Sequence, residues 1–136
     1  MNIGLIAQDT KKKLMQNFCI AYHNSLGKHN LFATGSTGRL IEEATGLSVH
    51  KYLGGALGGC EQFANQIEGN GLDLVIMFRD ADQSPRPMER SLFDAKKILM
   101  LCDQYSIPTA TNLATAELLV KSLDSGDLEW REAYHS

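Results

Sequence analysis

Two kinds of segment alternate along the chain. Short and nearly continuous apolar runs, typical of strands buried on both faces, occur at 2–7, 30–33, 47–53, 72–78 and 107–110. Between them, apolar residues at helical spacing predict helices over 11–25, 40–45, 61–68, 91–105 and 113–123. Regular alternation of this kind predicts an α/β fold, a three-layer sandwich with a mainly parallel five-stranded sheet.

Length and charge limit what this protein can be. Its 136 residues, of which 43% are hydrophobic, suit one domain over 1–136. A net charge of −3 argues against nucleic acid or an anionic membrane surface as the main partner, and the three lysines at 11–13 are too few to reverse it. The apolar run at 2–7 is too short for a signal peptide, and no run reaches membrane-spanning length. We therefore expect a cytoplasmic protein without a membrane partner.

Cysteine and histidine usage predicts no metal centre. The three cysteines are an odd number at scattered spacing, which favours reduced thiols over a disulfide framework or a zinc site. The four histidines share no metal-ligand spacing either. We therefore expect no structural metal.

The segment 33–38, Ala-Thr-Gly-Ser-Thr-Gly, follows the second apolar run and leads into a helix. Glycines can turn backbone N–H groups toward an anion, Thr34, Ser36 and Thr37 offer hydroxyl donors, and the helix adds its positive dipole end. We interpret the segment as a phosphate site. The alternative is a plain turn with an N-cap.

A second glycine cluster, 54–59, precedes the predicted helix at 61–68. It is too short to link two domains, so close approach to a ligand is the better interpretation. Cys60 follows it directly. A thiol at a helix start can act as a nucleophile or base, and the equally plausible alternative is a small buried side chain that fills space.

Candidate site residues collect at the carboxyl ends of the predicted strands, where ligands bind in open α/β sheets. Those that follow strands directly are Asp9, Thr34, Gly55, Asp80 and Asn112. Lys12 lies in the first turn of the next helix and can reach back across a strand end, although a solvated lysine is the default interpretation. Asp9, Asp80 and Asp94 offer carboxylates for proton abstraction beside a carbonyl, although such residues are also common as caps and solvated surface charges.

At these residues the chain resembles the methylglyoxal synthase family over nearly its whole length. The matching segments are 5–9 with Lys12, 33–38, 53–62, 78–80, the helix start at 94–99, and 107–116. The resemblance implies the fold of that family, a homohexamer, and cofactor-free conversion of dihydroxyacetone phosphate to methylglyoxal and inorganic phosphate. It implies phosphate binding by Lys12, Thr34, Ser36, Thr37 and Gly55, and active-site carboxylates at Asp9, Asp80 and Asp94.

Several positions depart from the family pattern. Gln8 replaces a histidine, Gly54 replaces a serine, and Cys60 replaces the aspartate that serves as catalytic base. The segment 81–93 contains no histidine, whereas the family has a substrate-contacting histidine there.

Two readings follow from these departures. In the first, the protein is a synthase in which Cys60 or Glu61 takes the proton and Arg79 or Arg86 stabilises the oxyanion. In the second, it is a non-catalytic module that binds a phosphorylated metabolite or inorganic phosphate and serves regulation. The same phosphate site applied to another phosphorylated substrate is a third possibility.

Overall fold

The computed structural model describes residues 1–52, 59–80 and 95–133, apart from the side chains of residues 60, 132 and 133. Its centre is a five-stranded sheet in the order β3-β2-β1-β4-β5, with every neighbouring pair parallel. The strands are β1 (Asn2–Ala7), β2 (Asn30–Thr34), β3 (Val49–Tyr52), β4 (Leu74–Phe78) and β5 (Thr109–Ala110). The predicted parallel five-stranded sheet is confirmed.

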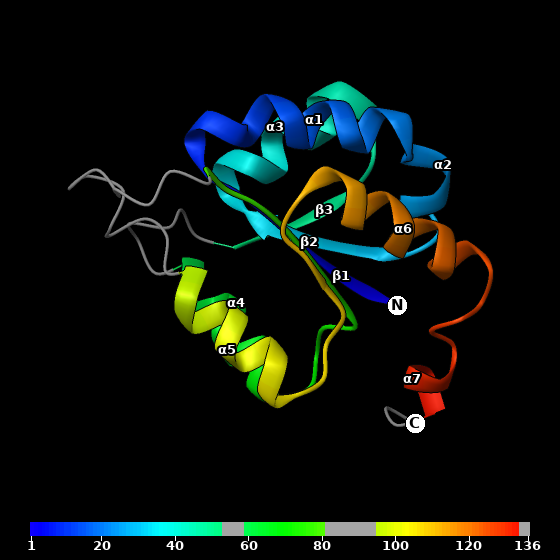
Figure 1. Cartoon of the computed structure of the whole chain (residues 1–136). Coiled ribbons are helices and arrows are strands. Elements are labelled where there is room, and N and C mark those ends of the chain that lie inside the picture. The colour runs from blue at the N-terminus through cyan, green and yellow to red at the C-terminus, as the bar shows by residue number, and fades with distance from the viewer. Residues whose placement is uncertain (53–58, 81–94, 134–136) are drawn as a thin grey trace.

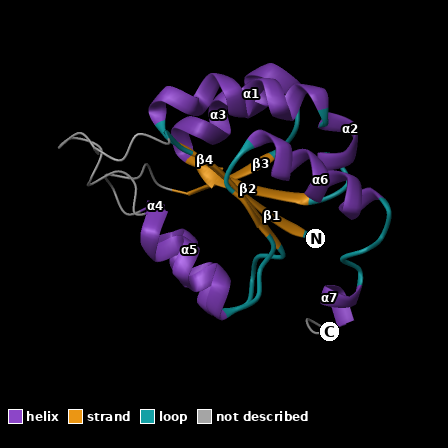
Figure 2. Ribbon diagram, viewed as in Figure 1, coloured by secondary structure: helices purple, strands orange, loops and turns teal. Residues whose placement is uncertain are grey.

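Helices cover both faces of this sheet (Figures 1 and 2). One layer contains α1 (Lys12–Ala21), α2 (His23–Leu26), α3 (Gly35–Thr45) and α6 (Leu113–Asp124). The opposite layer contains α4 (Gly59–Glu68) and α5 (Ala95–Gln104), and the short α7 (Trp130–Ala133) follows α6. Among the described residues, no helix combines the length and the apolar character needed to cross a membrane.

The position of β4 between β1 and β5 in the sheet explains why its sequence is apolar at every position. All five of its residues are buried. Leu74, Ile76 and Phe78 pack into the core cluster shared with α1, α3 and α6, whereas Val75 and Met77 pack into the cluster shared with α4 and α5. A central parallel strand has a core on each side, so alternation of polar and apolar residues is lost.

Two predicted helix starts are wrong in detail. The first helix does not begin at 11, because Lys11 is the last residue of a 3-10 turn, η1 (Asp9–Lys11), and α1 begins at Lys12. The segment around Ser36, predicted as a loop, is already helical: Thr34 is the N-cap and α3 begins at Gly35. The predicted end of this helix at 45 is confirmed, and Gly46 adopts φ +75° directly after the last turn.

Strand order determines where a ligand can enter. The chain runs outward from β1 through β2 to β3, then returns to the other side of β1 as β4. The connections that leave β1 and β4 therefore diverge, and such a divergence at the carboxyl ends of parallel strands is the usual ligand crevice of an open α/β sheet. Residues 8–12 and 79–80 stand at this divergence.

Candidate functional site

A lysine and a serine from two different helices meet at the carboxyl edge of the sheet. Lys12, the first residue of α1, donates from Nζ to Oγ of Ser36 in the first turn of α3 at 2.6 Å. The same Nζ lies 3.1 Å from Oδ1 of Asp9. The lysine side chain is 21% exposed and that of Asp9 is 61% exposed, so the cation is partly sheltered while its carboxylate partner faces solvent.

The side chains of Thr34 and Thr37 lie at the start of α3, next to Ser36. Thr34 caps α3 by backbone position, but its side chain makes no capping hydrogen bond. Thr37 is only 1% exposed, and its hydroxyl oxygen has no hydrogen-bond partner among the described residues. Buried hydroxyls normally find a partner, and an unpaired one costs about 1–3 kcal/mol. The hydroxyl of Thr37 is therefore a candidate hydrogen-bond donor in the first turn of α3.

The glycines of this segment are needed for a different reason from the backbone freedom that the sequence suggested. Gly35 and Gly38 lie inside α3 and neither has a positive φ, so backbone freedom is not what they provide. A Cβ at Gly38 would lie 2.6 Å from Cγ of Lys51, and one at Gly35 would lie 3.3 Å from the carbonyl oxygen of Tyr52. Both glycines allow α3 to pack closely against β3.

Asp80 stands two residues beyond β4 and is held by groups that follow β1. Its Oδ2 accepts a hydrogen bond from Oγ1 of Thr10 at 2.5 Å, and its Oδ1 lies 3.9 Å from Nζ of Lys11. Its backbone N–H donates to Oε1 of Gln8 at 2.8 Å. The side chain of Asp80 is 35% exposed, so the carboxylate remains open to solvent on one side.

Some predicted residues fall outside the description. Gly55 lies in 53–58 and Asp94 lies in 81–94, as does Arg86. The backbone of Cys60 is the second residue of α4, and its side chain is not described. The sheet edge thus collects Asp9, Lys12, Thr34, Ser36, Thr37 and Asp80 in the described part of the chain.

Three polar residues at this edge were not assigned to the site from the sequence. Gln8 was noted only as a departure from a family pattern, and Thr10 was not singled out. The hydroxyl of Tyr52, at the end of β3, is buried and has no hydrogen-bond partner in the part of the chain that the structure describes. Burial raises the pKa of Tyr52 to about 12, so at neutral pH it keeps its proton. The available signal was position, since Tyr52 ends a strand, Gln8 directly follows one, and Thr10 lies in the turn after the same strand.

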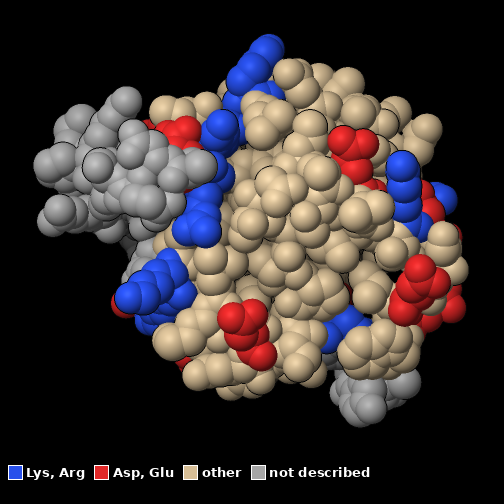
Figure 3. Space-filling model, viewed as in Figure 1, with Lys and Arg blue, Asp and Glu red and all other residues tan. Residues whose placement is uncertain are grey.

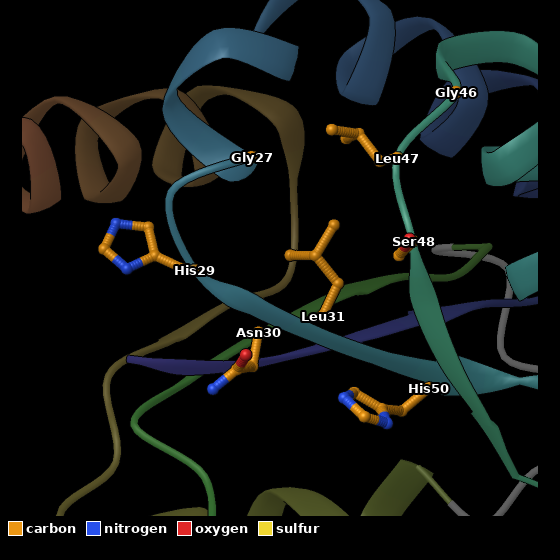
Figure 4. A pocket seen from close by; sticks show the side chains of 8 residues that line it. All are labelled: Gly27, His29, Asn30, Leu31, Gly46, Leu47, Ser48 and His50. Carbon is orange, nitrogen blue, oxygen red and sulfur yellow. The ribbon is translucent and has the colours of Figure 1, made fainter.

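Charge and shape distinguish the two ends of the sheet. Lys and Arg side chains gather on the left of the molecule in Figure 3, the side toward which the strands run in Figure 1. A hollow of about 290 Å³ lies at the opposite end, beside the starts of β2 and β3 (Figure 4). Leu31 and Leu47 point toward each other there. None of the described predicted site residues lines it.

Fold and edge together define the class of protein: an α/β domain with a cationic, hydroxyl-rich and carboxylate-bearing cluster at the carboxyl edge of a parallel sheet. A family model described as the MGS-like domain matches residues 15–111. A methylglyoxal synthase of Caldicellulosiruptor saccharolyticus is 56% identical over 97% of this chain and 91% of its own length, and one of Listeria welshimeri is 50% identical over 97% and 96%.

A solved structure agrees with these relatives. The crystal structure of methylglyoxal synthase from Elizabethkingia anophelis superposes with a TM-score of 0.80 at 36% identity, covering 88% of this chain and 76% of that one. The chain belongs to the methylglyoxal synthase family.

Proposed function

We propose that this protein converts dihydroxyacetone phosphate to methylglyoxal and inorganic phosphate. The observation that carries the proposal is the contact of Lys12 with Ser36 beside the unpartnered hydroxyl of Thr37. A cation and two hydroxyls at a helix start suit a phosphate dianion, because charge-assisted hydrogen bonds and the helix dipole act together. Thr34 and Gly55 complete the proposed phosphate site.

The proposed reaction needs a base and a stabilised oxyanion. A base removes a proton from the carbon that bears the free hydroxyl, and the electron pair forms an enediolate with the neighbouring carbonyl. The bond from carbon to the phosphate ester oxygen then breaks, phosphate leaves with its electron pair, and the enol that remains tautomerises to methylglyoxal. We assign the base to Cys60 or Glu61 and oxyanion stabilisation to Arg79 or Arg86.

The carboxylates have supporting roles in this proposal. Asp9 lies beside the phosphate-binding Lys12, and Asp80 is held by Thr10, two residues before that lysine. We assign both carboxylates to proton exchange with a substrate oxygen while the phosphate is held. Asp94 is assigned to the same group by its match to the family pattern. No cofactor takes part in the proposed steps.

A direct assay tests the proposal. The purified protein, incubated with dihydroxyacetone phosphate, is expected to release methylglyoxal and inorganic phosphate in equal amounts, each measured in parallel. Phosphate released without methylglyoxal would indicate a phosphatase instead. No product at all, with inorganic phosphate still bound in calorimetry, would support the second candidate, a non-catalytic phosphate-binding module, which the replacements at Gln8 and Cys60 favour.

Thr37 allows the phosphate site to be tested separately from catalysis. Thr37→Val removes a buried hydroxyl that has no partner and keeps the shape of the side chain. We expect the free energy of unfolding in urea to stay equal or rise by about 1 kcal/mol, because no hydrogen bond is lost. Phosphate affinity, measured by calorimetry, should fall by about five- to tenfold. A variant that loses stability but binds phosphate normally would contradict this role.

We also propose a homo-oligomer, a hexamer by family resemblance, that acts in the cytoplasm. Cys19 and Cys102 are free and buried, which supports a reducing compartment. Burial raises the pKa of Cys19 to about 12, so this thiol stays protonated and takes no part in the proposed chemistry.

A further inference from the structure

Gln8 extends the pairing of β1 with β4 beyond the end of the sheet. Its backbone N–H donates to the carbonyl of Phe78 at 3.0 Å, the last main-chain bond between these two connections. Its side-chain Oε1 then accepts the N–H of Asp80 at 2.8 Å. A side-chain amide thus replaces the next backbone acceptor, and it holds the main chain of Asp80 where the two connections would otherwise separate.

Thr10 holds the side-chain carboxylate of Asp80. Its hydroxyl donates to Oδ2 of Asp80 at 2.5 Å, whereas Lys11 lies 3.9 Å from Oδ1. The lysine and the carboxylate are each about a third exposed, so their ion pair adds little and restricts geometry weakly. A short hydrogen bond to one oxygen is directional, so Thr10 sets the rotation of the carboxylate.

The turn that holds this carboxylate also begins the phosphate site. Thr10 is the middle residue of η1, and Lys12, which contacts Ser36, follows at the start of α1. One short segment of backbone, 10–12, therefore connects the carboxylate of Asp80 to the lysine that contacts α3. If phosphate is held by Lys12, the position of Asp80 relative to the rest of the substrate is set through Thr10 and Gln8.

We propose that Thr10 and Gln8 are positioning residues that orient Asp80 toward the substrate carbons. This inference rests on the proposed function, because it concerns the rate of that reaction. Positioning of this kind affects the chemical step more than binding, since the phosphate contacts are made by other residues. The expected signature is a lower kcat at nearly constant KM.

The test compares three variants of the full-length protein. Thr10→Val removes the hydroxyl and keeps the branched shape, while Thr10→Ser keeps the hydroxyl and removes a methyl group. Ser25→Ala is the matched control, because Oγ of Ser25 donates to Oδ2 of Asp124 at 2.6 Å in an exposed pair far from the site. For each protein we would measure kcat and KM with dihydroxyacetone phosphate, Kd for inorganic phosphate, and the melting temperature.

Thr10→Val is expected to lower kcat by about tenfold, with KM and the phosphate Kd changed by less than about twofold. Thr10→Ser should retain most of the wild-type kcat, and Ser25→Ala should match the wild type. An unchanged kcat in Thr10→Val, or a parallel loss of phosphate affinity, would overturn the positioning role while leaving the proposed function intact. An inactive wild type would overturn both.

Discussion

Replacing Cys60 by alanine is expected to reduce kcat for methylglyoxal formation by about two to four orders of magnitude. Cys60 is the second residue of α4, a helix that begins at the carboxyl edge of the sheet. The family resemblance places the catalytic base at this position, where the relatives' pattern has an aspartate. A thiolate at a helix start can take that role, because the positive end of the helix dipole favours the ionised thiol.

The neighbouring Glu61 is the competing base, and a matched variant separates the two. Glu61 is exposed in the first turn of α4. Glu61→Gln should leave kcat within about threefold of the wild type if Cys60 is the base, whereas a loss as large as that of Cys60→Ala would move the assignment to Glu61. Phosphate affinity should stay constant in both variants, since neither residue belongs to the proposed phosphate site.

The variant Cys60→Asp introduces a base where the Cys60→Ala variant removes one. It restores the carboxylate of the family pattern, so we expect at least the wild-type kcat. Activity that occurs in Cys60→Asp alone would mean that the natural protein keeps the pocket and has lost its base. The regulatory binding module would then be the better description.

Lys12→Ala is expected to weaken inorganic phosphate binding by about 10- to 100-fold, because a charge-assisted hydrogen bond contributes about 1.5–3 kcal/mol. The loss has a second component. Nζ of Lys12 lies 3.1 Å from Asp9, and without the lysine that carboxylate would stand unpaired beside the anion. Titration calorimetry with phosphate measures the affinity, and kcat/KM for the substrate should fall at least as far.

Lys13→Ala is the matched control for this change. Lys13 is the next residue of α1, is exposed, and carries the same charge. Its removal changes net charge equally and should alter the phosphate Kd by less than about twofold. If both variants lose affinity equally, the effect is one of overall charge, and the assignment of Lys12 to the phosphate site is wrong.

Periodicity predicted the sheet well because parallel strands that are buried on both faces accept mainly apolar residues. All five strands were located, and Asp9, Thr34, Asp80 and Asn112 do end or follow strands at one edge. Element boundaries were less accurate. The predicted helix over 11–25 is divided at Tyr22 into α1 and α2, and the second β-strand continues one residue further, to Thr34.

The site itself was predicted in part. Hydroxyls and a lysine near strand ends suggested phosphate binding, and the structure brings Lys12 and Ser36 together. The reason given for the glycines was wrong for Gly35 and Gly38, because close packing of α3 on β3 requires them. A sequence pattern shows that a residue is small, but not which neighbour needs the space.

Residue order alone determined the fold class and the sheet edge at which the candidate site residues gather, because strand periodicity and the parallel arrangement follow from local pattern. Only the tertiary structure decided which of these residues touch. The bonds from Thr10 and Gln8 to Asp80 join segments that are far apart in the chain, and they depend on the register of β1 against β4. Such contacts arise from packing, which no local pattern records.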